Sequence, residues 1–145
     1  MAMIARQPDP SPLLVELGRL SNRREVTRFF RQHADVCDAS MVERLHDEVV
    51  HLTLADVGRA DRLARAARQL ADILADDGAR AQSMRAAGHV LFARGHWADA
   101  LERYTEALDL FRRTGQDLYV ARTLSGPLQT LFYLGQYDRA SAPAD

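Results

Sequence analysis

Small and large residues alternate at fixed spacings between Met84 and Leu110, and this pattern constrains the fold more than any other feature of the chain. The small residues stand where two helices would cross closely, and the large ones where side chains would fill the space between them. The members of the pattern are Ala87, Gly88, Gly95, Trp97, Ala100, Tyr104 and Ala107. The segment predicts two antiparallel helices, roughly residues 80–94 and 97–113, with breaks at Gly95 and Gly115. Such a hairpin buries its apolar face only against neighbouring hairpins, so a stacked array is expected.

Length and composition predict one globular domain without covalent cross-links. The chain has 145 residues, of which 47% are hydrophobic, which is close to the average for globular proteins. A single cysteine, Cys37, excludes an intrachain disulfide. A net charge of −1 gives no reason to expect nucleic acid or an anionic membrane as a partner. No run approaches the roughly 20 apolar residues that span a bilayer, so we expect no membrane association and a cytoplasmic protein.

The rest of the chain also follows a helical period, and no strand-like alternation is apparent. We expect a first helix from Ser11–Pro12 to about Leu20 and a second one capped by Ser21 or Asn22. A third helix is expected to begin at Asp38 or Ser40. A fourth follows Gly58, with Ile73 facing inward and Gly78 as its C-terminal cap.

These elements predict one helical-repeat domain, residues 12–145, after a disordered N-terminal lead, residues 1–11. Within the domain we expect a helical cap, a degenerate repeat, a well-formed repeat and a partial repeat, at residues 12–35, 41–77, 80–115 and 117–142 respectively.

The partial repeat is predicted from an echo of the hairpin at an offset of 40 residues. Gly135, Tyr137 and Ala140 stand where Gly95, Trp97 and Ala100 stood. This register predicts a turn at Gly135 and the start of a second helix that is cut short. Leu128 then occupies the position of the small Gly88, and Pro127 is expected to kink the helix that contains it.

Residues 81–110 resemble a tetratricopeptide repeat (TPR). The resemblance lies in Ala87, Gly88, Leu91, Gly95, Trp97, Ala100, Tyr104 and Ala107. Met84 replaces the aromatic residue of the family's first helix, and the closing proline is missing near Arg112. The resemblance implies an all-α, right-handed solenoid of antiparallel hairpins, with about seven or eight helices here. It also implies a scaffold or adaptor without enzymatic activity that binds a peptide or protein on its concave face.

A looser resemblance, over roughly residues 20–140, is to the N-terminal repeats of bacterial CHAT-domain proteins. In that family the repeats precede a caspase-like domain with a His–Cys pair, which is absent from this sequence. Two alternatives to a stand-alone adaptor therefore stay open. In the first alternative the chain is the truncated sensor segment of a CHAT-type protease. In the second it is the regulatory module of a transcriptional regulator.

Candidate chemical motifs are weak, and we expect no catalytic residue, metal site or cofactor. His46 and His51 are five residues apart, whereas zinc proteases space two histidines four apart on one helix face. Cys37 and His33 lack a third orienting group. Four arginines stand at positions 59, 62, 65 and 68, a spacing that drifts round a helix. Asp61, Asp72 and the acidic pair at 76–77 dilute their charge, which favours a solvated face over a nucleic-acid stripe.

The TPR resemblance places a partner-binding groove on the first helix of each hairpin. The groove would present Gln82, Arg85, His89, Phe92, Arg122, Ser125, Gln129 and Tyr133. Arginines would pair with carboxylates and aromatic rings would act as apolar anchors. The alternative to groove binding is that this polar face has no partner. The incomplete last repeat leaves an apolar patch that predicts a homodimer or poor solubility.

Overall fold

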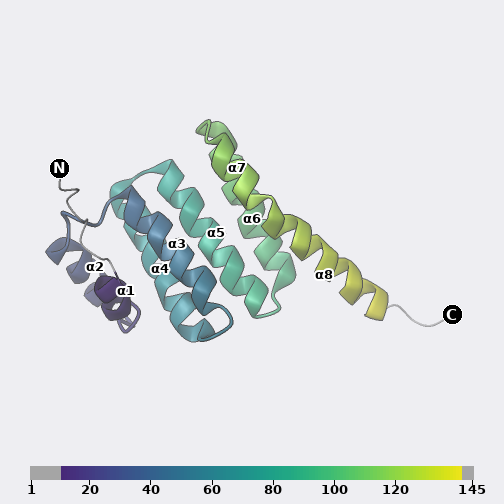
Figure 1. Ribbon diagram of the computed structural model, residues 1–145, viewed down its shortest axis with the longest axis horizontal. Coiled ribbons are helices and arrows are strands. Elements are labelled where there is room, and N and C mark those ends of the chain that lie inside the picture. The colour runs from purple at the N-terminus through teal and green to yellow at the C-terminus, as the bar shows by residue number, and fades with distance from the viewer. Residues whose placement is uncertain (1–10, 142–145) are drawn as a thin grey trace, which may run out of the picture.

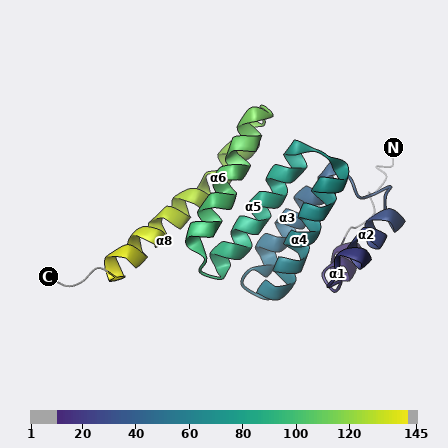
Figure 2. The same ribbon diagram turned by 180° about the vertical axis from the view of Figure 1, so that it is seen from behind.

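The structure is a computed structural model that describes residues 11–141. Its helices lie side by side in chain order, from α1 and α2 at one end to α8 at the other (Figures 1 and 2). The eight helices of this part of the chain are α1 (Ser11–Leu17), α2 (Arg23–Gln32), α3 (Ala39–Leu52), α4 (Val57–Leu74), α5 (Asp77–Ala93), α6 (Trp97–Arg113), α7 (Asp117–Thr123) and α8 (Ser125–Ser141). The predicted all-α stack of helical hairpins is confirmed. Of the predicted lead, residues 1–11, all but Ser11 lies outside the described residues, and Ser11 begins α1.

Four of the helices begin at a side-chain cap. Asn22, Asp38, Asp56 and Asp76 each accept a hydrogen bond from the backbone N–H three residues on. This satisfies one of the N–H groups that every helix leaves unpaired at its start. Asn22 and Asp38 were among the expected caps of their helices.

Two glycines make the tight turns on either side of α6. Gly95 has φ +78° and Gly115 has φ +71°, in the left-handed region that L-residues with a Cβ disfavour. After each glycine the next N–H donates to a carbonyl five residues back: His96 to Leu91 and Gln116 to Phe111. Both breaks were predicted, and they fold α6 back between α5 and the α7–α8 segment.

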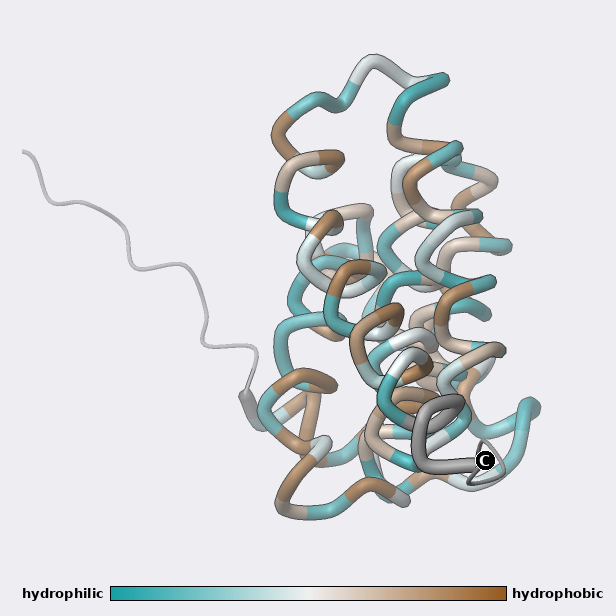
Figure 3. Tube along the Cα trace, turned by 90° about the vertical axis from the view of Figure 1, so that its right-hand side faces the viewer, coloured by the Kyte–Doolittle hydropathy of each residue, from teal (hydrophilic) through white to brown (hydrophobic). Residues whose placement is uncertain are grey.

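The stack has two layers of helices, with the buried side chains between them. α3 contacts both α4 and α5, α5 contacts α4, α6 and α8, and α6 contacts α7 and α8. Hydrophobic residues recur along the helices at intervals rather than in one block (Figure 3). The fully buried members include Val42, Leu45, Leu63, Leu70 and Phe111. Burying such side chains is the main driving force for stacking, at roughly 1.5–3 kcal/mol each.

The side chain of Tyr104 in α6 packs between α5 and α8 and so joins the last two hairpins. This side chain is 2% exposed and lies against two glycines, Gly88 of α5 and Gly126 of α8. A Cβ at Gly88 would stand 2.7 Å from the ring, and one at Gly126 would stand 2.9 Å from it. The two helices approach α6 this closely because neither glycine carries a side chain.

Several predicted boundaries in the first half are wrong. The first helix ends at Leu17 instead of Leu20. α4 starts at Val57 and ends at Leu74, where Ala75 adopts the left-handed cap conformation (φ 50°) expected of Gly78. Gly78 instead lies in the first turn of α5, because Asp76 caps that helix. Ile73, expected to face inward, is 55% exposed.

The predicted register of the last repeat is also wrong. α8 continues through Gly135 to Ser141, so no turn forms there and no backing helix begins at Tyr137. The small residue that receives Tyr104 is Gly126, whereas Leu128 is 66% exposed. Pro127 lies in the first turn of α8, where the helix is interrupted at Leu124. The break therefore falls just before the proline. Proline has no backbone N–H to donate within a continuous helix, so it is tolerated in the first turn.

Candidate functional site

The first helices of the hairpins, α3, α5 and the α7–α8 segment, form one side of the stack, which we call the first-helix face. α5 and α8 lie beside each other along this face, and α3 lies on the other side of α5. The two rows of residues proposed from sequence meet at two points. Arg85 Nη2 donates to the Arg122 carbonyl at 3.3 Å. The rings of Phe92 and Tyr133 meet edge to face with centroids 5.2 Å apart.

Two residues of the predicted groove pack against neighbouring helices. Gln82 is 5% exposed and lies in the packing around α5. His89 is turned toward α6, where its Nδ1 lies 2.8 Å from the hydroxyl of Tyr104. Its Nε2 is buried and has no hydrogen-bond partner among the described residues. Neighbouring helices cover Gln82, whereas His89 is half-buried with its Nδ1 directed at α6, and a role of either side chain in binding a partner stays a prediction.

The remaining members of the predicted set lie at least partly at the surface. Arg122, Ser125, Gln129 and Tyr133 are exposed, and Arg85 and Phe92 are half-buried. Together they form a strip along α5 and the α7–α8 segment. Their role in binding a partner stays a prediction.

A carboxylate from α3 completes the polar part of the face and was missed by the sequence reasoning. Glu43 Oε2 accepts a hydrogen bond from the hydroxyl of Tyr119 at 2.9 Å. Glu43 Oε1 lies 3.9 Å from Arg122 Nη1, and the Arg122 guanidinium lies 5.7 Å from the centre of the Tyr119 ring. The degenerate repeat hid the signal.

The two ends of the face differ in chemistry. At the N-terminal ends of α3 and α5 a hollow of about 330 Å³ has polar lining residues that include Ser40, Glu43, Asp76 and Gln116. The opposite end is aromatic. There Tyr133 contacts Phe92, Phe132 and Trp97, with the Trp97 and Tyr133 ring centres 5.5 Å apart. A second hollow, of about 350 Å³, lies beside Trp97. The face therefore runs from a polar end, past two arginines, to an aromatic end.

A buried polar cluster lies beneath the face. The rings of His46 and His89 are 5.1 Å apart, and His89 bonds Tyr104 while His46 Nδ1 lies 3.0 Å from Asp47 Oδ1. Burial, with the nearby guanidinium of Arg85, lowers the pKa of each histidine to about 3. Burial also raises the pKa of Tyr104 above its ordinary value. Both histidines are therefore neutral at pH 7, and the cluster is a packing element.

The other candidate motifs do not form reactive groups. Cys37 is buried, and burial, with the carboxylates of Asp35 and Asp38, raises the pKa of its thiol to about 11. At neutral pH it is a thiol, whereas a nucleophilic cysteine needs a lowered pKa. His46 is buried and His51 is exposed, so the pair does not share a site. In residues 11–141, side chains of His, Cys, Asp and Glu form no group of three or more placed to hold a metal ion. No helix of this part of the chain is long and apolar enough to cross a membrane.

Stacked antiparallel hairpins with an exposed first-helix face form a TPR-like helical-repeat fold. Comparison with known families agrees: residues 79–144 match the model for the tetratricopeptide repeat. The match begins in α5 and covers just under half of the chain, including the α5 and α7–α8 parts of the first-helix face but not α3. It supports a TPR protein and, in general terms, a protein–protein interaction module. No curated protein and no solved structure matches the chain.

Proposed function

We propose that the first-helix face between α5 and α8 binds a peptide segment of a protein partner. The observation that carries the proposal is the arrangement of Arg85 and Arg122 next to a partly exposed aromatic cluster on a TPR-type repeat. Arginine forks bind carboxylates with defined geometry, and aromatic rings provide the apolar anchors typical of interface hot spots. The segment expected to bind combines an acidic residue with a large apolar side chain. The proposal applies equally to a stand-alone adaptor and to the sensor or regulatory segment of a longer protein.

Peptides selected from a displayed random library on the wild-type chain test this proposal. Arg122→Glu should weaken the selected peptides at least about tenfold, because it replaces an exposed cation with a like charge for the acidic ligand. Arg122 is a better choice than Arg85, which is half-buried and bonds the Arg122 carbonyl. Arg112→Glu, on α6, is the matched control with the same charge change. Selected peptides that bind both variants equally, or a library that gives no binders, would contradict the proposal.

We further infer that α8 pairs with the same helix of a second copy. Four large apolar residues lie at helical spacing along the outer side: Leu124, just before α8, and Leu128, Leu131 and Phe132 within it. They are 39%, 66%, 52% and 62% exposed. α8 also projects beyond the stack (Figure 1). A contiguous apolar stripe of this kind is typical of an interaction surface, and a two-fold axis would let one stripe cover the other.

A further inference from the structure

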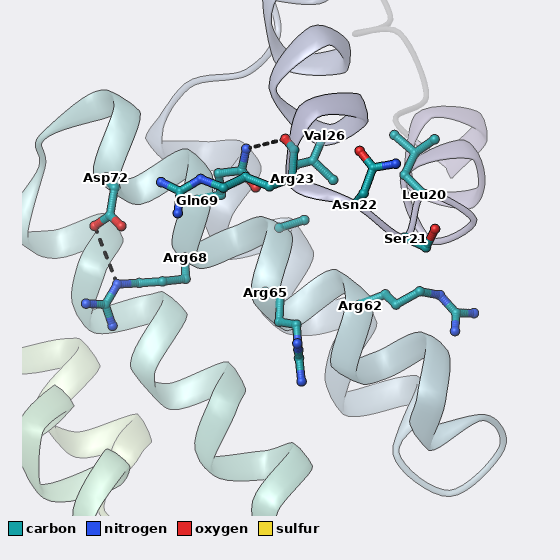
Figure 4. A pocket seen from close by; sticks show the side chains of 11 residues that line it. Leu20, Ser21, Asn22, Arg23, Val26, Arg62, Arg65, Arg68, Gln69 and Asp72 are labelled. Atoms are coloured by element: carbon teal, nitrogen blue, oxygen red, sulfur yellow. Dashed lines mark hydrogen bonds and ion pairs between the residues drawn. The ribbon is translucent and has the colours of Figure 1, made fainter.

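A third hollow, with a different chemistry, lies on the other side of the stack, between the start of α2 and the outer side of α4. Its volume is about 320 Å³, and arginines from both helices line it: Arg23, Arg62, Arg65 and Arg68 (Figure 4). Leu20, Val26 and Ala66 form an apolar floor. A shallower hollow adjoins it along α2, lined by Thr27 and four arginines at positions 23, 24, 28 and 31. Arg23 lines both hollows, and together the two, which we call the arginine-lined depression, are lined by seven arginines.

The positive charge of this depression is only partly neutralised. Asp72, the acidic residue that lines it, is shared between Arg68 at 3.4 Å and Arg80 at 3.7 Å. Asp61 is likewise shared between Arg65 and Arg94. On α2, the guanidinium groups of Arg23, Arg24, Arg28 and Arg31 make no ion pair with any residue that the structure describes. Several guanidinium forks thus remain available to an anionic ligand.

Hydrogen bonds between distant parts of the chain hold the walls in place. Gln69 Nε2 donates to the Arg23 carbonyl at 3.0 Å and also to the hydroxyl of Thr27, which fixes α2 against α4. Arg62 Nε donates to the Gly18 carbonyl at 2.7 Å, which ties the α1–α2 connection to the same helix. A depression fixed in this way does not have to be assembled when a ligand arrives, which lowers the cost of binding.

The arrangement selects for an extended ligand over a small ion. In Figure 4 the side chains of Arg62, Arg65 and Arg68 leave α4 in different directions and do not converge on one point. Their backbones cover about 9 Å of helix, since each residue rises about 1.5 Å, which is the length of roughly three extended peptide residues. The apolar floor of the depression lies between flanking arginines, so it fits a peptide in which an apolar side chain lies between acidic side chains.

Nucleic acid and membrane fit less well. Among the described residues, the lining contains no aromatic side chain on which bases would stack. Val26 and Ala66 are buried at the floor, whereas a membrane-binding surface projects its apolar side chains. We propose that the arginine-lined depression between α2 and α4 is a second docking site, which binds an acidic peptide segment with an apolar residue between its carboxylates. This site is separate from the first-helix face and does not depend on the function proposed for that face.

Fluorescence anisotropy with a labelled peptide of alternating Glu-Glu-Leu units tests the proposal on the full chain. The wild type should bind, and binding should weaken as salt is added because the contacts are between charges. The double variant Arg23→Gln/Arg68→Gln should lose at least about tenfold in affinity, since two charge-assisted contacts are removed. The matched control is Arg112→Gln/Arg113→Gln on α6, which removes the same charge and should bind like the wild type.

Two further probes make the test specific. A peptide with Ser in place of Leu should bind several-fold more weakly, because the floor then has no apolar group to cover. Equal binding of the peptide to the wild type and to the Arg23/Arg68 variant would overturn the proposal. Tighter binding of single-stranded DNA or of phosphatidylserine vesicles than of the peptide would also overturn it. Circular dichroism of the double variant, expected to match the wild type, checks that the fold is intact.

Discussion

At the scale of single residues, the contact between Tyr104 and two glycines leaves no room for a methyl group. A Cβ at Gly88 would meet the ring at 2.7 Å and one at Gly126 at 2.9 Å. We expect Gly88→Ala and Gly126→Ala each to lower the free energy of unfolding by about 1–3 kcal/mol, because the ring has to move out of a packed site. Gly135→Ala is the control: its Cβ would meet nothing within 4 Å, and alanine favours the helix. Urea denaturation gives the free energy of unfolding of all three variants. Equal stability of Gly88→Ala and Gly135→Ala would contradict the close packing of Tyr104 against Gly88.

The buried histidines predict a loss of stability in acid. Each has a pKa of about 3 in the folded protein and an ordinary value of 6.5, so the unfolded chain takes up protons first. Their contribution is fully present above pH 6.5 and is lost as the pH falls toward 3. Each histidine should contribute up to about 1.4 kcal/mol per pH unit in this range.

Paired variants isolate that contribution from the many carboxylates that also titrate. His46→Gln, with a neutral side chain at all pH values, should give a shallower dependence of the unfolding midpoint on pH between 6 and 4. His51→Gln, an exposed histidine on the same helix, should keep the slope of the wild type. A His46→Gln slope as steep as that of the wild type would show that His46 is not neutral in the fold.

At the scale of elements, the end of α4 is held in a strained conformation. Ala75 has φ 50°, which costs a residue with a Cβ about 1–2 kcal/mol. Glycine removes this strain but loses about 0.4–1 kcal/mol through the greater entropy of the unfolded chain. Because the strain costs more than the entropy, Ala75→Gly should raise the free energy of unfolding by about 0.5–1 kcal/mol. Ala55→Gly, in the preceding interhelix turn, has no positive φ to relieve and should destabilise; thermal denaturation compares the two.

The sequence predicted the elements better than their ends. Gly95 and Gly115 were recognised as turns because each follows a long helical period and is followed by another. Gly78 and Gly135 gave the same local signal, yet one begins a helix and the other lies inside one. The surroundings of each glycine decide: Asp76 already caps α5, and α8, which packs on Tyr104 of α6 through Gly126, continues as a helix past Gly135.

At the candidate site, too, the local sequence pattern predicted some side-chain positions and missed others. Arg122, Gln129 and Tyr133 were placed at the surface from repeat positions alone, since those positions face away from the hairpin. Gln82 and His89 occupy equivalent positions, but Gln82 is buried and His89 is half-buried and bonded to Tyr104 of α6. Glu43, which meets Tyr119 from 76 residues away, depends on a contact that no local pattern encodes.

At the scale of the whole molecule, the stack presents three distinct surfaces: the first-helix face, the arginine-lined depression and the apolar stripe on α8. The stripe predicts self-association of the full chain. We expect sedimentation velocity to show a shift from monomer to dimer as the protein concentration rises. Leu128→Glu/Leu131→Glu places two like charges at the centre of the contact in both copies, and the variant should remain monomeric at every concentration. Gln136→Glu adds charge at another exposed position of α8 and should dimerise like the wild type. A wild type that stays monomeric, or a dimer that survives the double substitution, would show that α8 is not the interface.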